Sequence, residues 1–355
     1  MYTPYFNITP KVTKYIEAIG MVFGYFRSVQ LPDSYRRELV SKVTAETVHS
    51  STAIEGNTLT AQQVVDVLSG KSIYAQNIDI QEVLNYNHAL SFAESSVRES
   101  NFSVTQQTIR QINRLILKDI REDIAGVYRT KQVFVGDYWP PEHYKVSAMM
   151  DNFVAWINRP TPLDLSPILY AGIAHYQLVA IHPFEDGNGR TTRVLTSLLL
   201  LLHGYPVTSL VALESYYNRN RQAYYQALSS ADQYRVGGEP DLTLWLEYYT
   251  EGLLIEAERA RSRLEEQVHR ERNQSRKISL QKHQKDFLLA INQHGSARTA
   301  DYIELSGLSR RGAYNGVKEM IRLGLVERLG AGRASRYVLT DQGLTYVQTI
   351  MTIEL

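Results

Sequence analysis

The chain has 355 residues, of which 44% are hydrophobic and 21% charged, so it is long enough for two or three domains with a sizeable core. Its 38 basic and 37 acidic residues give a net charge of +1, which excludes a global field that steers the whole chain to nucleic acid or membrane. The absence of cysteine excludes disulfides and thiolate metal sites.

The sequence shows no targeting or membrane-spanning segment. The stretch MYTPYFNITPKV at the N-terminus lacks a basic region followed by a long apolar run. The most apolar stretch, Val194–Leu202, is far shorter than the ~20 residues that a membrane helix needs. We therefore expect a cytoplasmic protein without a membrane partner.

Helical patterns dominate the first two thirds of the chain. Thr60-Ala-Gln-Gln63 predicts a capping box, and the helix after it is expected to bury Val64, Val65 and Leu68 on one face. The other predicted helices are Leu39–Ile54, Asp79–Glu94, Thr105–Leu117, Val146–Ile157, Pro167–Ile181, Thr191–Leu202 and Asn218–Ala231. These patterns predict a mainly α fold.

The helical period is interrupted once in this region. Tyr128–Val135 is rich in β-prone residues and is followed by Gly136-Asp137 and Pro140-Pro141. This pattern predicts a β-hairpin, or flap, set into a helical domain.

The last third of the chain has a different composition. Glu256–Lys277 is rich in Glu, Arg, Gln and Asn, which predicts an exposed, charged linker helix. Beyond it, from Leu280 to Leu355, short helices are expected at Lys285–Gln293, Arg298–Glu304 and Ser309–Leu323, followed by strands at Val326–Leu329 and Arg336–Leu339 around a glycine-rich tip.

The segment HPFEDGNGRTTR, His182–Arg193, concentrates more chemistry than any other part of the sequence. Gly187-Asn188-Gly189 lets backbone N–H groups point at one spot, and the helix that starts near Arg190 turns its positive end toward them. Arg190 and Arg193 suit phosphate oxygens, Asp186 suits Mg²⁺ and His182 can accept a proton. Taken singly, each piece is more often a helix end or a turn; together they indicate nucleotide phosphate chemistry.

HPFEDGNGRTTR resembles the signature of the Fic family, whose pattern is HPFx-acid-GNGRxxR, and every specified position matches. The resemblance extends over roughly residues 51–231. It implies a helical fold with a β-hairpin flap, and transfer of AMP from ATP to a Ser, Thr or Tyr hydroxyl of a protein, with Mg²⁺. The target implied is an unknown protein or the chain itself.

The resemblance also implies roles for single residues. His182 would be the base and Asp186 the Mg²⁺ ligand, while Gly187, Asn188 and Gly189 would form the anion hole and Arg190 and Arg193 would contact the β- and γ-phosphates. Val133, Phe134, Val135 and Gly136 would belong to the flap, for which the alternative is an ordinary hairpin. Tyr224, Tyr225 and Asp232 would form the adenine end, although the family often has Asn in place of Asp232 and paired tyrosines are mostly core.

Ser51-Thr-Ala-Ile-Glu55-Gly56 on its own is a helix end with a glycine cap and a surface charge. Beside a Fic motif it resembles the family's inhibitory helix, which implies that Glu55 pairs with Arg193 and excludes a productive γ-phosphate. The sequence then divides into an N-terminal helical region with this helix (residues 1–110), a Fic core (111–255), a linker helix (256–279) and a C-terminal domain (280–355).

The C-terminal domain resembles a winged helix-turn-helix. Arg298–Leu339 carries eight basic and four acidic residues by our count, and Arg310 and Arg311 begin the expected recognition helix. DNA is therefore an expected partner, although many winged helices bind only proteins. Two alternatives to the transferase remain at this point: a DNA-binding regulator that senses nucleotide, and a Fic enzyme that removes AMP or moves another phosphate group. Homodimer formation is also left open.

Overall fold

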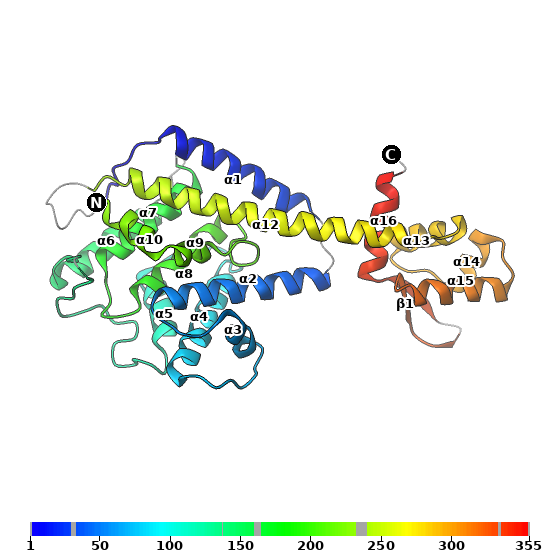
Figure 1. The fold of residues 1–355 in the computed structure, drawn as a ribbon, viewed down its shortest axis with the longest axis horizontal. Coiled ribbons are helices and arrows are strands. Elements are labelled where there is room, and N and C mark those ends of the chain that lie inside the picture. The colour runs from blue at the N-terminus through cyan, green and yellow to red at the C-terminus, as the bar shows by residue number, and fades with distance from the viewer. Residues whose placement is uncertain are drawn as a thin grey trace. The chain divides into compact units, whose positions relative to one another are not determined.

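A computed structural model gives the fold (Figure 1) and describes residues 2–29, 33–136, 138–159, 165–231, 240–332 and 335–353. The chain forms two compact units. The larger unit comprises Met1–Ser28 and Leu39–Ala260, and the smaller one comprises Val29–Glu38 and Arg261–Leu355.

The described part of the larger unit is helical, as predicted. Its helices are α1 (Pro10–Ser28), α2 (Asp33–Ile54), α3 (Ala61–Leu68), α4 (Asn77–Ser96), α5 (Gln106–Leu117), the 3₁₀ turn η1 (His143–Lys145), α6 (Val146–Ile157), α7 (Pro167–Ile181), α8 (Asn188–Leu202), α9 (Leu213–Arg219), α10 (Arg221–Ser229) and α12 (Thr243–Lys277). Residues 33–38 of α2 and 261–277 of α12 count with the smaller unit. Figure 1 shows α12 running beside α1, where Lys11 pairs with Glu247 at 3.5 Å.

The core of this unit surrounds α7. Its sequence, PILYAGIAHYQLVAI, is apolar on every side, and nearly all of its side chains are buried. Helix α7 packs against α6 and α8, and α8 also packs against α4 and α5. Residues 182–187 therefore connect two core helices, which fixes both ends of the segment that carries the sequence motif.

Two local predictions need correction. The Thr60 capping box is present, but the buried valines of α3 are Val64 and Val67, while Val65 is 39% exposed. The predicted helix Asn218–Ala231 is in fact two helices that meet at Asn220. The side chain of Asn220 accepts a hydrogen bond from the N–H of Ala223 at 3.0 Å and starts α10 as an N-cap.

The charged segment Glu256–Lys277 is not a separate helix, because it is the second part of α12. The first part of α12 is buried through residues such as Trp245, Tyr249 and Leu253. The sequence pattern therefore marked a change of surroundings along one continuous helix. The four-part division of the chain stays a prediction.

The predicted flap is an extended segment closed by a tight turn. Val135 and Tyr138 exchange backbone hydrogen bonds of 3.0 and 2.9 Å, which form a single antiparallel bridge. A second bridge joins Tyr128 to Phe184. Asp137 lies outside the described residues.

The smaller unit contains α13 (Lys282–His294), α14 (Thr299–Ser306), α15 (Arg310–Arg322), β1 (Val326–Leu329), β2 (Arg336–Leu339) and α16 (Asp341–Ile353). Strands β1 and β2 pair antiparallel, with Val326 opposite Leu339 and Leu329 opposite Arg336. Phe287, Leu288, Tyr302 and Met320 are among the side chains of a hydrophobic core that belongs to this unit alone. This arrangement matches the predicted helices and strands, while residues 333 and 334 of the predicted tip lie outside the described residues.

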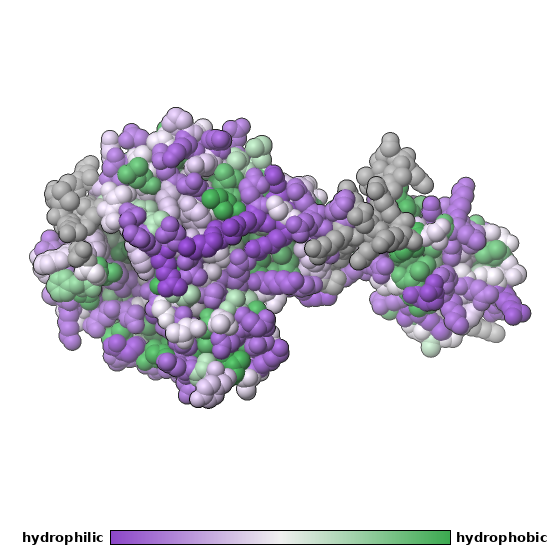
Figure 2. Space-filling model, in the orientation of Figure 1, coloured by the Kyte–Doolittle hydropathy of each residue, from purple (hydrophilic) through white to green (hydrophobic). Residues whose placement is uncertain are grey.

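Hydrophilic residues cover most of the face of the larger unit that Figure 2 shows, with separate hydrophobic patches between them. Across the described ranges, none of the helices has both the length and the apolar character needed to cross a membrane.

Candidate active site

His182 directly follows Ile181, the last residue of α7, and is the C-cap of that helix. Its backbone is left-handed, with φ 50°, an uncommon conformation for a residue with a side chain. Its Nδ1 lies 3.3 Å from the carbonyl oxygen of Val179. A carbonyl can only accept, so Nδ1 carries the proton of the neutral ring, which leaves Nε2 as the proton acceptor. Burial lowers the pKa of His182 to about 4, against the opposing effect of the Val179 hydrogen bond.

Arg129 holds the backbone around His182. Arg129 is only 3% exposed, and its Nε donates to the carbonyl oxygen of His182 at 2.8 Å. Its terminal nitrogens donate to the carbonyl oxygens of Lys131, at 3.3 Å, and of Pro141. One buried guanidinium therefore ties the end of α7 to the base of the flap segment.

The loop after His182 is closed by Asn188. Its amide donates to the carbonyl oxygen of Phe184 and accepts from the N–H of Phe184, both at 2.9 Å. Asn113 of α5 supports the loop from behind, because its Nδ2 donates to the carbonyl oxygen of Asp186 at 3.0 Å. Gly187 lies directly against Asn113 with φ 76°, so a side chain there would be strained and crowded. These contacts fix the loop at the start of α8, where the first-turn N–H groups of a helix have no partner within the helix itself.

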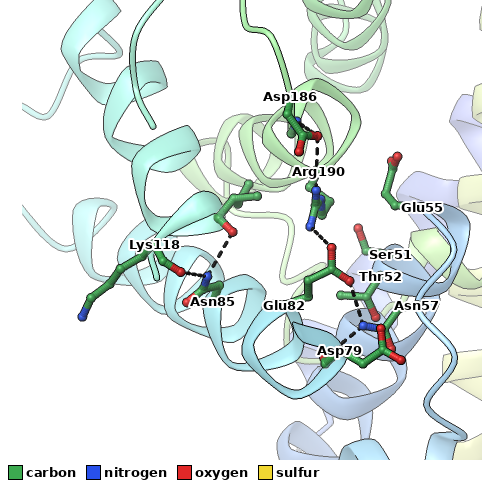
Figure 3. A network of polar contacts seen from close by, with 12 residues as sticks. Ser51, Thr52, Glu55, Asn57, Asp79, Glu82, Asn85, Lys118, Asp186 and Arg190 are labelled. Carbon is green, nitrogen blue, oxygen red and sulfur yellow. Dashed lines mark hydrogen bonds and ion pairs between the residues drawn. The ribbon is translucent and has the colours of Figure 1, made fainter. Parts of the chain in front are cut away.

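Arg190 is buried and paired. Its Nη1 lies 2.7 Å from Oε1 of Glu82, which comes from α4, and its Nη2 lies 3.5 Å from Oδ1 of Asp186. Asp186 itself is 45% exposed at its side chain. Figure 3 shows Asp186, Arg190 and Glu82 in one line of contacts.

Arg193 carries the predicted ion pair. Its Nη2 lies 2.7 Å from Oε1 of Glu55, its Nε donates to the hydroxyl of Ser51 at 2.7 Å, and Nη2 also donates to the Ser51 carbonyl at 3.0 Å. Burial alone would raise the pKa of Glu55, but the charges of Arg193 and Arg190 and the Arg193 hydrogen bond outweigh it and lower the pKa. Gly189 makes room for this pair, because a β-carbon there would collide with the Glu55 carboxylate.

A cavity of about 610 Å³ lies over these groups. Its walls include the proposed base, one arginine, the glutamate that holds it, and part of the flap segment. The lining residues are Glu55, Val135, Gly136, Tyr138, Tyr176, Val179, Ala180, His182, Gly189, Arg193, Gln222, Tyr224, Tyr225, Gln226, Leu228 and Ser229. The volume suits a ligand of nucleotide size.

The two tyrosines of α10 differ in surroundings. Tyr224 is 1% exposed, its ring stacks on Tyr217 at 4.5 Å, and its hydroxyl lies 2.9 Å from Nε2 of His175. Tyr225 is 48% exposed, and both tyrosines line the cavity. Asp232, expected near them, lies outside the described residues.

The flap residues also differ in their surroundings. Val135 and Gly136 line the cavity. Phe134 is 59% exposed and its ring meets that of Trp139 at 5.1 Å, while Val133 is half-buried. Of the residues predicted to be inhibitory, Glu55 reaches the cavity, Ser51 is fully buried against Arg193, and Gly56 follows the end of α2 with φ 100°.

The model of the Fic/DOC family matches residues 103–200, which hold the motif and the helices on both sides of it. Residues 103–200 of this chain are therefore similar to the Fic/DOC family. A curated Fic protein of Nematostella vectensis, named protein adenylyltransferase Fic, is 36% identical over 191 residues, or 52% of this chain and 42% of that protein. One of the same name from Aedes aegypti is 34% identical over 192 residues, or 52% of this chain and 36% of its own length.

Solved Fic structures share the fold. Residues 134–508 of Fic-1 from C. elegans superpose with a TM-score of 0.63 at 28% identity, covering 72% of this chain and 73% of that one. A Fic family protein from Desulfovibrio desulfuricans G20 superposes over 96% of this chain and 98% of its own with a TM-score of 0.65; at 24% identity it shows the fold alone. The chain spans about two fifths of the length of the curated Fic relatives quoted above. Residues 282–340 match the C-terminal domain of the DIP2311-like transcriptional regulators.

Three residues that support the Fic motif could not be found from the sequence. Asn113 and Glu82 read as polar positions of amphipathic helices, and Arg129 reads as one residue of a β-prone run. Each acts on a segment between 53 and 108 residues away in the chain. The only local signal is that the residue is charged or polar in a segment otherwise expected to be buried.

Proposed function

We propose that this chain is a protein adenylyltransferase that moves AMP from ATP to a hydroxyl of a target protein or of itself. The observation that carries the proposal is the single cavity that joins His182, Gly189, Arg193 and the flap residues Val135 and Gly136. The names of the curated relatives support the same reaction.

The residues suggest how the transfer proceeds. His182 Nε2 takes the proton of the attacking hydroxyl, whose oxygen forms a bond to the α-phosphorus of ATP. The bond from that phosphorus to the bridging oxygen breaks, and pyrophosphate leaves. The first-turn N–H groups of α8, together with Arg190 and Arg193, hold the phosphates and stabilise the charge that develops on them.

Asp186 fits a Mg²⁺ ion that arrives with the nucleotide. Its half-exposed carboxylate lies beside the start of α8, and the described residues contain no group of three or more His, Asp or Glu side chains suited to hold a metal alone. Mg²⁺ commonly takes one carboxylate and otherwise water and phosphate oxygens, so the donor set fits. When bound, the ion would neutralise charge on the phosphates.

Glu55 holds this site in an inhibited state. Its Oε1 pairs with Nη2 of Arg193 at 2.7 Å, so the guanidinium is not available to the γ-phosphate. A hydrogen bond between charged groups contributes about 1.5–3 kcal/mol, so its removal should raise the transfer rate by about tenfold to about 150-fold.

Intact-mass spectrometry after incubation with ATP and Mg²⁺ tests both parts of the proposal. We expect a gain of one AMP group in Glu55→Gly, a weaker gain in the native chain and in Glu55→Gln, and none in Glu55→Gly with His182→Ala. An equal mass gain with and without His182 would mean that His182 takes no part in the transfer. No gain in any chain, with and without an added lysate as source of targets, would count against transferase activity.

We propose a second role for the smaller unit, which is binding to duplex DNA. Arg310 and Arg311 are exposed at the start of α15, where a recognition helix contacts bases and phosphates. The match to a transcriptional regulator domain supports this role. Fluorescence anisotropy with random-sequence duplex DNA at low salt should show binding by the full chain that weakens as salt rises, and that falls at least about tenfold in Arg310→Ala/Arg311→Ala. Equal binding by both chains would place the contact elsewhere.

A further inference from the structure

Both arginines of α8 are held by carboxylates from other helices. Glu55 at the end of α2 pairs with Arg193, and Glu82 of α4 pairs with Arg190, each at 2.7 Å. The side chain of Glu82 is 16% exposed, so this second pair is nearly removed from water. Neither the motif nor the transfer chemistry assigns Glu82 a role.

The second oxygen of Glu82 leads back to the inhibitory segment. Its Oε2 accepts a hydrogen bond from Nδ2 of Asn57 at 2.9 Å, and the same Nδ2 donates to the carbonyl oxygen of Asp79 at 3.0 Å. Figure 3 shows Asn57 between Asp79 and Glu82, with Arg190 on the far side of Glu82. Asn57 is 9% exposed. Both donor contacts of its amide therefore go to one turn of α4.

Asn57 is only two residues from Glu55, and the backbone between them is tightly folded. The N–H groups of Glu55 and Asn57 both donate to the carbonyl oxygen of Thr52, at 3.0 and 3.2 Å. The Asn57 side-chain oxygen accepts the N–H of Leu59 at 3.1 Å. These hydrogen bonds leave the turn little freedom. The contact of the Asn57 side chain with α4 therefore limits where the Glu55 carboxylate can lie.

We propose that Asn57 is a positioning residue for the inhibition of this site. Its contact with Glu82 and Asp79 fastens the turn that follows α2 to α4, which keeps Glu55 on Arg193. Through Glu82 the same contact is continuous with Arg190, so the inhibitory turn is tied to both phosphate-binding arginines. This inference rests on the proposed function, since it assumes that Glu55 competes with a nucleotide phosphate.

The test compares Asn57→Ala, Glu55→Gly and the double variant in the full chain. Two quantities are measured for each: the initial rate of AMP incorporation, and the Kd for the Mg²⁺ complex of an ATP analogue with a methylene group between the α- and β-phosphorus atoms. We expect Asn57→Ala alone to raise the rate and tighten binding by about tenfold, which corresponds to ~1.4 kcal/mol. In the Glu55→Gly background the same substitution should change both by less than about twofold, because the residue through which it acts is gone.

Asn85→Ala is the matched control. Asn85 lies one turn further along α4, is fully buried, and donates to the carbonyl oxygens of Ile116 and Lys118 at 3.1 and 2.6 Å. Its loss removes a similar pair of hydrogen bonds without touching α2, so it should lower thermal stability and leave inhibition in place. If Asn57→Ala does not fold, Asn57→Asp keeps the acceptor for Leu59 and places a negative charge against Glu82, with the same expected gain.

Three results would overturn the proposal. The first is an unchanged rate and Kd in both Asn57 variants. The second is an equal gain in the presence and absence of Glu55, and the third is an equal gain in Asn85→Ala. If Glu55→Gly transfers no AMP at all, the transferase proposal fails while the Kd comparison still tests the role of Asn57. Absence of nucleotide binding in every chain, Glu55→Gly included, would overturn both.

Discussion

At the scale of single residues, burial sets the protonation state of His182, the proposed base. An unperturbed histidine is half protonated near pH 6.5, and a base that is already protonated cannot accept a proton. The surroundings of His182 disfavour its charged form, since burial and, to a smaller degree, the charge of Arg129 lower its pKa to about 4. The ring is therefore neutral, with Nε2 available, across the whole physiological range.

This lowered pKa makes a prediction about pH. In Glu55→Gly, kcat/KM for AMP transfer should change less than about twofold between about pH 8 and about pH 5.5, and should fall only as His182 becomes protonated nearer its pKa of about 4. Removing Glu55 does not reverse the sign, because its negative charge raises the pKa of His182. The Kd of the ATP analogue at each pH controls for titration of the nucleotide. A tenfold loss of activity already at pH 5.5 would show an ordinary histidine pKa.

At the scale of helices, glycines show that packing can outweigh helix propensity. Gly172 of α7 lies against α12, and a β-carbon there would stand 2.7 Å from Cδ1 of Tyr249, while the Gly172 carbonyl accepts a hydrogen bond from Trp245 Nε1 at 2.7 Å. Gly20 of α1 is exposed, and a β-carbon there would meet nothing within 4 Å.

The same substitution should therefore act in opposite directions at these two positions. Gly20→Ala should stabilise the protein by up to about 1 kcal/mol through helix propensity. Gly172→Ala should destabilise it by about 1–3 kcal/mol, because the added methyl group forces α7 and α12 apart. Urea unfolding curves give both values. A stabilising Gly172→Ala would mean that α7 and α12 can separate without cost.

Helices were also the scale at which the sequence was most informative. The Thr60 capping box, the start of α7 at Pro167 and the loop of HPFEDGNGRTTR all depend on contacts within a few residues, and the pattern predicted each of them. The pattern failed where partners lie far away. Val67 is buried and Val65 is exposed in α3, which packs against α4, and the periodicity of one short helix could not tell which side would be covered.

The same physical limit applies to the site. His182 and Arg193 could be proposed from the residue types of the motif, and Glu55 only from the resemblance to the Fic family; the cavity brings the three together. Glu82, Asn57 and Arg129 act through hydrogen bonds to segments that only the tertiary fold brings near. Tyr224 and Tyr225 are neighbours in sequence and both line the cavity, yet Tyr224 is buried with its hydroxyl beside His175, while Tyr225 is 48% exposed.

At the scale of the whole molecule, the two units have separate cores. The cluster of buried side chains around Phe287, Tyr302 and Tyr337 contains residues from Leu280 to Val347, and Phe287 contacts Tyr302 with ring centroids 4.5 Å apart. In the larger unit, Phe153 of α6 is equally buried. If each core supports its own unit, a cavity made in one core should leave the stability of the other unit unchanged.

Calorimetry on the full chain tests this independence. A buried Phe→Ala change costs about 3–5 kcal/mol, so Phe287→Ala should lower one thermal transition by many degrees. A nucleotide analogue with Mg²⁺ should raise the other transition, since a ligand stabilises only the unit that binds it. AMP transfer by Phe287→Ala should stay within about twofold of the starting chain at temperatures below the lowered transition.

Phe153→Ala should instead lower the transition that responds to nucleotide and reduce transfer as the larger unit unfolds. A single transition that moves with either substitution would mean that the two cores unfold as one cooperative structure, in which case nucleotide binding would also stabilise the smaller unit.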